Sequence, residues 1–142
     1  MFECTLIETL PSPADYNRLR KAVQWGVYDE SVIEKALPTT LYCVCTYVGG
    51  ALIGMARVIG DAGLVHNIQD VILLPEYQHQ GIGAQLMDAV MAYIRANAHN
   101  NTIIGLMAAI GKEAFYEKYS FHVRPDDTHG AGMTQFWRKE NG

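Results

Sequence analysis

The stretch from Leu64 to Arg95 constrains the fold of this 142-residue chain more than any other part of the sequence. It begins with an apolar strand, Leu64 to Leu74, that ends in the continuous hydrophobic run typical of a strand buried on both faces. A short loop, residues 75–80, opens with proline. A helix then starts at Gly81, with apolar residues spaced as in a helix that packs on a sheet: Ile82, Leu86, Ala89 or Val90, and Tyr93.

The glycines at the start of this helix predict a phosphate-binding site. Gly81 and Gly83 have no side chain to shield the first helical N–H groups, so an anion can approach the backbone at the positive end of the helix dipole. Two familiar phosphate motifs do not fit. A dinucleotide fingerprint requires glycine where this chain has Leu86, and the Gly-Lys-Ser/Thr of a P-loop is missing. A glycine-containing turn without a ligand is the alternative at this point.

Composition predicts one folded domain over residues 1–142. Apolar residues make up 49% of the chain and charged residues 18%, which is typical of a globular protein with a single core. The net charge of −4, without a stripe of Lys and Arg, argues against a nucleic-acid partner and mildly favours a cationic substrate such as an amine. No apolar run reaches the length of a membrane span, and the first residues do not form a signal segment. We therefore expect a cytoplasmic protein without a membrane partner.

The cysteines and histidines do not predict a metal site. Cys43 and Cys45 lie on one face of an expected strand, where small side chains pack well, and Cys4 is far from them in the sequence. The five histidines are scattered singly. A metal site needs several ligands at suitable spacing, so we expect no metal.

The order of the remaining elements predicts the architecture. Ser12-Pro13 starts a first helix, with Ser as N-cap and Pro at the first helical position, and Pro38 ends a second helix that begins near Asp29. Gly49-Gly50 predicts a two-residue hairpin between two strands. A short fourth helix is expected over Lys112–Tyr119. Besides Leu64–Leu74, the expected strands are Phe2–Thr9, Leu41–Val48, Ala51–Ile59, Thr102–Ala108, Phe121–Arg124 and Met133–Trp137.

Two motifs in this order resemble those of the GNAT acetyltransferases. Gln78-x-x-Gly81-x-Gly83 after an apolar strand is similar to the Q/R-x-x-G-x-G/A motif of that superfamily, and Phe115-Tyr116 with Phe121 is similar to its A-x-x-F-Y-x-x-x-G-F pattern. The resemblance implies an α/β (α+β) fold. It comprises a mixed, mostly antiparallel sheet of about seven strands, splayed between strands 4 and 5 and flanked by four helices.

Within that superfamily the chain most resembles the bacterial and plastid branch that includes the serotonin (arylalkylamine) N-acetyltransferases. The residues that carry this likeness are Gly54–Arg57, Asp70-Val71, the Gln78-to-Gly83 motif, Phe115-Tyr116, and Gly132-Met133 ahead of Phe136-Trp137. Two positions depart from the family pattern. Ser120 replaces the usual glycine, and Ala109 stands where relatives often place Asn or Asp.

The resemblance implies a cofactor site for acetyl-CoA as the acetyl donor. The pantetheine arm would pair with a strand edge at Val71, Ile72 and Leu73, and an N–H near Leu73 would bond the thioester oxygen, which is oxyanion-type stabilisation. The pyrophosphate would be held by backbone amides of the loop and first helical turn: Gln78, His79, Gln80, Gly81, Ile82, Gly83 and Ala84. Gln78 adds no charge, so this cradle depends on backbone dipoles.

Tyr116 and Asp70 are the candidate catalytic groups. Tyr116 matches the family tyrosine, and a phenol with a pKa of roughly 10 suits protonation of the departing thiolate; the alternative is packing beside neighbouring aromatic rings. Asp70, a carboxylate in an apolar strand, is expected to act as base or amine anchor, or else to pair with Arg57. His66 is the second candidate base. Simple strand alternation places it on the same face as Asp70, so the two could share a water chain.

Trp25 and Tyr28 predict an aromatic corner that binds the acceptor, although a contact between two helices explains them equally well. We expect an N-acetyltransferase acting on a small primary amine, with an aryl-alkyl body favoured by the branch resemblance. Acetylation of a peptide lysine or N-terminus, or binding of acetyl-CoA without catalysis, remain alternatives. Association into a homodimer is also left open.

Overall fold

The computed structural model describes residues 3–139, so Phe2, expected in the first strand, lies outside the described residues. The chain forms two compact units, residues 1–106 and 107–142, and each is described by itself. The prediction of a single domain stays a prediction. In the described residues of the first unit, short one-turn helices occur at Leu37–Thr39 (η1) and Pro75–Tyr77 (η2). The larger elements are β1 (Thr5–Glu8), α1 (Pro13–Ala22), α2 (Glu30–Ala36), β2 (Tyr42–Val48), β3 (Ala51–Gly60), β4 (Val65–Leu73), α3 (Ile82–Asn97) and β5 (Ile103–Leu106).

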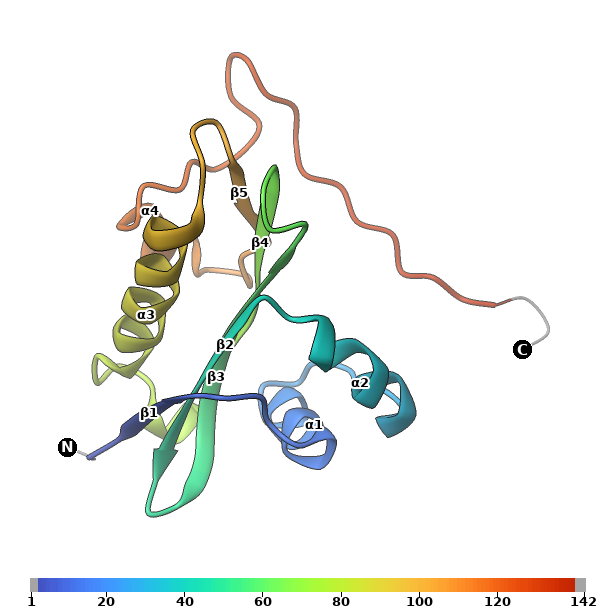
Figure 1. Cartoon of the computed structure of the whole chain (residues 1–142), viewed down its shortest axis with the longest axis vertical. Coiled ribbons are helices and arrows are strands. Elements are labelled where there is room, and N and C mark those ends of the chain that lie inside the picture. Colours follow the sequence, from blue (N-terminus) through green and yellow to red (C-terminus); the bar gives the residue numbers. More distant parts are fainter. Residues whose placement is uncertain (1–2, 140–142) are drawn as a thin grey trace. The chain divides into compact units, whose positions relative to one another are not determined.

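The strands form one sheet in the order β1-β2-β3-β4-β5. Neighbouring strands are antiparallel except β4 and β5, which are parallel because α3 connects them. Helices α1 and α2 lie on one side of the sheet and α3 on the other (Figure 1). The predicted hairpin at Gly49-Gly50 is confirmed, since Val48 pairs with Ala51 across it.

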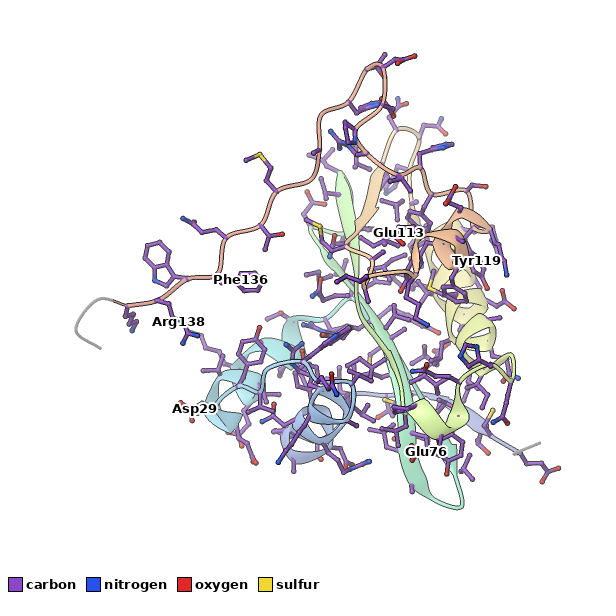
Figure 2. The ribbon with its side chains drawn as sticks, turned by 180° about the vertical axis from the view of Figure 1, so that it is seen from behind. Asp29, Glu76, Glu113, Tyr119, Phe136 and Arg138 are labelled. Atoms are coloured by element: carbon purple, nitrogen blue, oxygen red, sulfur yellow. The ribbon has the colours of Figure 1, made fainter. Side chains whose placement is uncertain are left out.

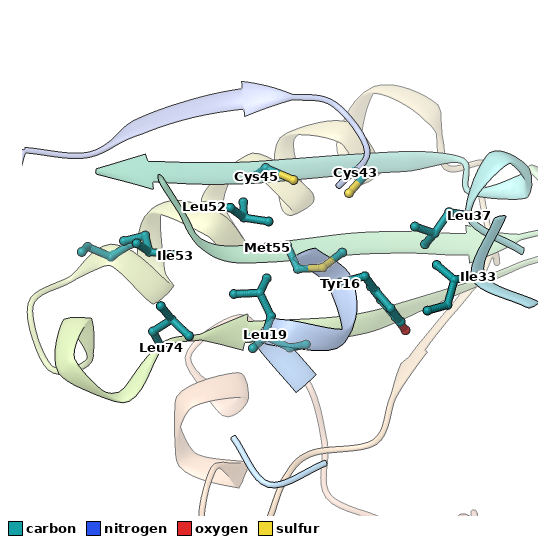
Figure 3. Close-up of a cluster of buried hydrophobic side chains, with 12 residues drawn as sticks. Tyr16, Leu19, Ile33, Leu37, Cys43, Cys45, Leu52, Ile53, Met55 and Leu74 are labelled. Atoms are coloured by element: carbon teal, nitrogen blue, oxygen red, sulfur yellow. The ribbon is translucent and has the colours of Figure 1, made fainter. Parts of the chain in front are cut away.

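Helix α1 begins as the sequence predicts. The Ser12 hydroxyl accepts a hydrogen bond from the Asp15 amide at 3.1 Å, and Pro13 takes the first helical position. The helix buries Tyr16 and Leu19 against the sheet, where they meet Met55 and Ile72 in the core (Figure 3). Cys43 and Cys45 pack in the same core as free thiols, which confirms that they share one face of a strand.

Asp70 interrupts the regular zigzag of β4. Arg57 on β3 pairs with Gln69, but Met55, two residues earlier on β3, pairs with Ile72, so β4 holds one extra residue between these pairs. Asp70 has φ +54°, the left-handed conformation found in bulges. Burial of the end of β4 alternates, because Ile72 is buried while Val71 and Leu73 are half-buried. The predicted burial of this run on both faces is therefore wrong.

The splay between β4 and β5 follows the bulge. Pairing between the two strands runs from Val65 with Ile103 to Ile68 with Leu106, where β5 ends. Strand β4 continues from Gln69 to Leu73 beyond this pairing. An edge of β4 is therefore left beside the start of α3, as the predicted fold requires.

The second unit contains α4 (Glu113–Glu117), shorter than the predicted Lys112–Tyr119. The expected strands Phe121–Arg124 and Met133–Trp137 are wrong, and the described sheet has five strands instead of seven. A strand exists only where a neighbour accepts its ladder of hydrogen bonds, and residues 121–139 adopt irregular backbone, with a turn in which Asp126 N–H donates to the His129 carbonyl. Figure 2 shows Phe136 and Arg138 on this irregular trace.

None of the helices in residues 3–139 combines the length and the apolar character needed to cross a bilayer.

Candidate active site

The N-terminus of α3 presents the predicted anion cradle. Gly81 is the N-cap residue with φ +83°, and no side chain caps the helix at this end. His79 just before it also has a left-handed φ of +64°, so the loop turns sharply into the helix. A Cβ added at Gly81 would meet nothing within 4 Å, so the space beside this N-cap residue is open. The predicted stretch from Gln78 to Ala84 therefore lies together as one loop and first turn.

The Gln78 side chain supports this loop from within. Its Nε2 donates to the Leu73 carbonyl at 2.9 Å and so joins the loop to the end of β4. The Oε1 atom of Gln80 is buried without a hydrogen-bond partner among the described residues. A buried polar atom without a partner is costly, and such atoms collect at sites that bind another molecule.

The end of β4 and the cradle together fit acetyl-CoA. Val71, Ile72 and Leu73 lie past the last pairing with β5, and the Leu73 carbonyl is tied to the loop that opens α3. An extended pantetheine arm can add to such an edge as another strand would, while the helix N-terminus attracts its pyrophosphate.

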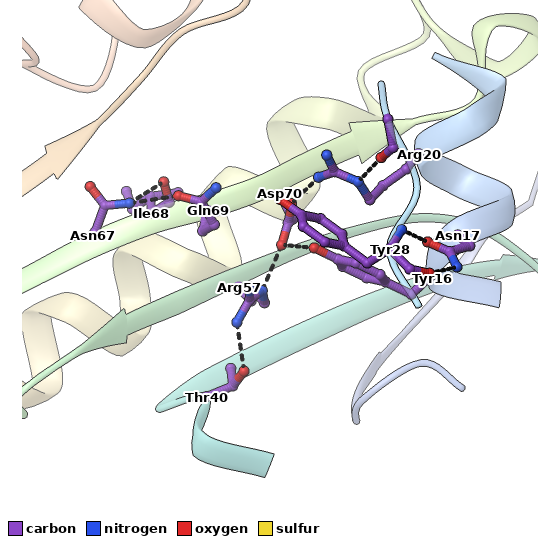
Figure 4. Close-up of polar contacts among 11 residues, drawn as sticks. Tyr16, Asn17, Arg20, Tyr28, Thr40, Arg57, Asn67, Ile68, Gln69 and Asp70 are labelled. Carbon is purple, nitrogen blue, oxygen red and sulfur yellow. Dashed lines mark hydrogen bonds and ion pairs between the residues drawn. The ribbon is translucent and has the colours of Figure 1, made fainter. Parts of the chain in front are cut away.

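Asp70 is enclosed by donors rather than open to a ligand (Figure 4). Its Oδ2 accepts from the Tyr16 hydroxyl at 2.7 Å and from Arg57 Nε at 2.7 Å, and its Oδ1 accepts from Arg20 Nη1 at 3.2 Å. The Asp70 side chain is 1% exposed. The expectation that Asp70 serves as base or amine anchor stays a prediction, and the three hydrogen bonds favour its alternative. The alternative, a pair with Arg57, is confirmed.

Burial and neighbouring charges shift the pKa values of Tyr16 and Arg57 in this cluster. Burial raises the pKa of Tyr16 to about 12, and the neighbouring Asp70 charge adds to the effect. Burial lowers the pKa of Arg57, but its hydrogen bond to Asp70 and the Asp70 charge outweigh this, so the pKa is raised overall. Tyr16 is therefore neutral and Arg57 charged near neutral pH.

His66 faces the other side of the sheet. Its ring lies 6.4 Å from the ring of Tyr93 on α3, whereas Asp70 contacts α1. His66 is 1% exposed, and its ring nitrogens have no hydrogen-bond partner in the described structure. The expected water chain between His66 and Asp70 is therefore wrong, because the bulge turns Asp70 away from the face of His66.

The predicted aromatic corner forms around Arg20. The guanidinium carbon of Arg20 lies 4.8 Å from the ring centre of Tyr28, 5.5 Å from that of Trp25 and 5.8 Å from that of Tyr16. The cation that these rings receive is therefore one of the protein's own side chains. Of the two residues predicted to bind the acceptor, Tyr28 lines a pocket on this face of the sheet.

Tyr116 lies on α4 in the second unit. Its ring makes edge contacts with Phe115 at 5.1 Å and Phe121 at 6.4 Å. Burial raises the pKa of Tyr116 to about 12, so its hydroxyl keeps its proton near neutral pH. The predicted packing and a role as proton donor are both compatible with this environment.

Among residues 3–139, no cluster of three or more His, Cys, Asp or Glu side chains is arranged to hold a metal ion.

The family follows from a comparison with known domains. Residues 17–136 match the model of the acetyltransferase (GNAT) domain. The chain belongs to the GNAT family of acetyltransferases. The match covers the start of α3, the edge of β4, and Arg20, Arg57 and Asp70, so these features lie within a family of acetyltransferases.

Two relatives of this domain are described as acetyltransferases. An uncharacterized N-acetyltransferase, ycf52, from Gracilaria tenuistipitata var. liui is 34% identical over 86 residues, which are 61% of this chain and 44% of that protein. The chain thus spans less than half the length of that relative. A Staphylococcus aureus protein of unknown function, described as a probable acetyltransferase, has a crystal structure that is 31% identical. It superposes with a TM-score of 0.87 over 95% of this chain and 100% of that one.

A GNAT family acetyltransferase from Elizabethkingia anophelis, solved with acetyl-CoA bound, superposes with a TM-score of 0.60. It is 20% identical and covers 86% of this chain and 78% of that chain, so it supports the fold alone.

Sequence reasoning missed the roles of Tyr16 and Arg20. Neither residue stands in a motif that predicts a role in a site. Both contact Asp70, which lies 54 and 50 residues away along the chain. A buried aspartate in an apolar strand was the available signal, because it requires cationic or hydroxyl partners from elsewhere in the fold.

Proposed function

We propose that this domain transfers the acetyl group of acetyl-CoA to a small primary amine by direct attack in a ternary complex. The observation that carries the proposal is the uncapped N-terminus of α3 joined through Gln78 to the edge of β4. Anions bind at helix N-termini, and an extended chain binds along a strand edge, so one molecule with both parts suits this arrangement. The match to the acetyltransferase (GNAT) domain supports the choice of acetyl-CoA as that molecule.

In this proposal the residues of the cradle hold acetyl-CoA in place. Backbone amides from Gln78 to Ala84 would bind its pyrophosphate, and Val71 to Leu73 would align its pantetheine arm. Acetyl-CoA supplies the acetyl group and a thiolate leaving group. An N–H near Leu73 would stabilise the thioester oxygen as negative charge develops there.

Tyr116 is the proposed general acid. A buried phenol with a pKa of about 12 remains protonated at neutral pH and can donate its proton to the departing thiolate. Asp70 has no part in this scheme, because three donors already occupy its oxygens.

The resemblance to the arylalkylamine branch and the aromatic rings of Tyr16 and Tyr28 support an acceptor with an aromatic body. Both rings line the pocket described below, together with aliphatic side chains of α2. Aromatic and aliphatic walls bury the apolar part of such a molecule.

The test is release of free CoA from acetyl-CoA with a panel of tryptamine-like amines, polyamines and lysine peptides at equal concentration. We expect turnover with a small amine. Turnover with peptides alone would overturn the small-amine assignment and leave acetyl transfer in place. Tight binding of acetyl-CoA without turnover on any acceptor would instead favour a binding module.

Association into a homodimer is also proposed. Three large apolar side chains are mostly exposed: Met133 (89%), Phe136 (88%) and Trp137 (77%). Exposed apolar patches are typical of protein–protein interfaces. Light scattering after gel filtration tests it, and a mass of 15.8 kDa at every concentration would contradict it.

A further inference from the structure

A pocket with a cationic lining lies on the α1/α2 side of the sheet. Its volume is about 350 Å³, and its walls come from α1, the segment before α2, α2, η1, β3 and β4 within the first unit. The aliphatic part is formed by Val32, Ile33, Leu37 and Ile59. The polar part includes Tyr16, Tyr28 and Gln69, and the charged part is Arg20 and Arg57. Two guanidinium groups thus line the pocket, and its described lining includes no carboxylate.

Asp70 compensates only part of this charge. Each arginine bonds a different oxygen of the same Asp70 carboxylate, so the two guanidinium groups flank it. Two positive charges and one negative charge leave one positive charge at the pocket. Tyr16 does not change this balance because it is neutral near pH 7.

Each of the two arginines donates hydrogen bonds to the protein through only some of its guanidinium N–H groups. Arg20 donates through Nε to the Gly26 carbonyl and through Nη1 to Asp70, and its side chain is 14% exposed. Arg57 donates through Nε to Asp70 and through Nη1 to Thr40, and its side chain is 12% exposed. The hydrogen bonds of both guanidinium groups within residues 3–139 run through Nε and Nη1, and Tyr16 lies close enough to Arg57 to raise its pKa through a hydrogen bond. Two guanidinium groups, with a net charge of one after Asp70 is counted, therefore border the pocket.

We propose that this pocket binds a carboxylate of the acceptor, so that the acceptor is an amino acid, or a similar amino-carboxylate, rather than a simple amine. This inference rests on the proposed acetyl transfer. Guanidinium donors match carboxylate oxygens in geometry and charge. A phosphate carries about −1.5 to −2 charge at pH 7 and would leave the pocket negative. A bare ammonium would meet two guanidinium groups and no available carboxylate.

Matched acceptors that differ only in the carboxylate test this proposal. Tryptophan against tryptamine and phenylalanine against phenethylamine are assayed for kcat/KM with acetyl-CoA and the full chain. We expect the amino acid to exceed its amine by at least about tenfold, since a hydrogen bond to a charged group contributes about 1.5–3 kcal/mol. An amine that reacts as fast as its amino acid overturns the proposal and leaves acetyl transfer standing. Preference for phosphoethanolamine over β-alanine would overturn the choice of carboxylate.

Variants of Arg20 separate recognition from support of the fold. Arg20→Lys keeps a positive charge near Asp70 but removes the planar pair of donors. We therefore expect KM for the amino acid to rise, and the kcat/KM of each amino acid relative to its matched amine to fall. An equal loss for both members of a pair would mean a structural role only and would count against the proposal. Arg18→Lys is the matched control, because Arg18 on the same helix does not line the pocket and bonds Asp15 and the Leu52 carbonyl instead of Asp70.

Binding without turnover keeps the inference independent of catalysis. Calorimetry with tryptophan and with tryptamine, in the presence of CoA, reports the preference even if no acceptor is acetylated. Tighter binding of tryptophan that Arg20→Lys abolishes supports the pocket assignment. Equal binding of the two, or none of tryptophan, overturns it. Failure of acetyl transfer with all acceptors would count against the proposed function instead.

Discussion

His66 and Asp70 lie four residues apart on β4 but face opposite sides of the sheet. The His66 ring lies 6.4 Å from the ring of Tyr93 on α3, whereas Asp70 accepts a hydrogen bond from Tyr16 of α1. The left-handed Asp70, with φ +54°, adds one residue to the strand and reverses the alternation after it. The same bulge precedes the edge of β4 that we assign to acetyl-CoA. One local irregularity therefore both turns Asp70 toward α1 and comes directly before the unpaired strand edge.

Replacement of Asp70 tests its structural role. Asp70→Asn would leave Arg20 and Arg57 without their common counter-charge in a buried site, and breaking such a pair costs about 3–5 kcal/mol. Urea unfolding should show a loss of this size. Asp15→Asn is the control, because the Asp15–Arg18 pair is 46% exposed on both sides and should contribute at most about 1 kcal/mol. A stable Asp70→Asn protein that has lost only turnover would restore Asp70 as a base.

Gly54 allows β3 to approach the end of β4. A Cβ at this position would lie 2.8 Å from the Ile72 carbonyl oxygen and 2.9 Å from Leu73 Cδ1. Gly54→Ala should therefore destabilise the protein by about 1–3 kcal/mol through overpacking, and displacement of Leu73 should weaken acetyl-CoA binding. Thermal unfolding and calorimetry measure the two effects. Gly105→Ala should change little, because its Cβ would meet only Asn67 Oδ1 at 3.5 Å.

The anion cradle predicts the effect of a charge at Gly83. Gly83→Glu in the first turn of α3 would place a carboxylate beside the pyrophosphate, and the repulsion should weaken acetyl-CoA binding at least about tenfold. Calorimetry on the folded variant measures it. Gly130→Glu adds the same charge at an exposed, uncrowded position and should keep the affinity. Equal affinity for acetyl-CoA in the folded Gly83→Glu protein would rule out the cradle.

Tyr116→Phe removes one hydroxyl proton and keeps the aromatic ring against Phe115 and Phe121. Acetyl-CoA binding should be preserved, while turnover should fall by about 10²–10⁴-fold if this hydroxyl protonates the thiolate. Single-turnover rates are the appropriate measurement, because they isolate the chemical step. Tyr119→Phe, a hydroxyl loss in the same segment, should leave the rate within about twofold. An unchanged rate in Tyr116→Phe would return Tyr116 to a packing role.

Stability should decrease in alkaline solution because of Tyr16. Burial raises its pKa from 10.0 to about 12, so the folded protein holds this proton more tightly than the unfolded chain does. The contribution of Tyr16 is therefore complete below pH 10 and is lost between pH 10 and about 12. Urea unfolding at several pH values should show a steeper decline for the natural chain than for Tyr16→Phe. Equal slopes would mean that Tyr16 titrates normally.

The sequence by itself determined the local elements. Ser12 and Pro13 start α1, Gly49-Gly50 makes the hairpin, and Gly81 opens α3, because caps, turns and glycine conformations depend on a few neighbouring residues. The anion cradle was predictable for the same reason, since one loop and one helix turn contain it.

Tertiary structure alone decided what depends on distant neighbours. The bulge at Asp70 arises from pairing with β3 and reverses the side-chain faces that simple alternation predicts. The ion-pair partners of Asp70 come from α1 and β3. The sequence of β4 alone therefore could not show that Asp70 lies between two arginines. Residues 121–124 and 133–137 have the composition of strands, but a strand forms only where an adjacent strand completes its hydrogen bonds.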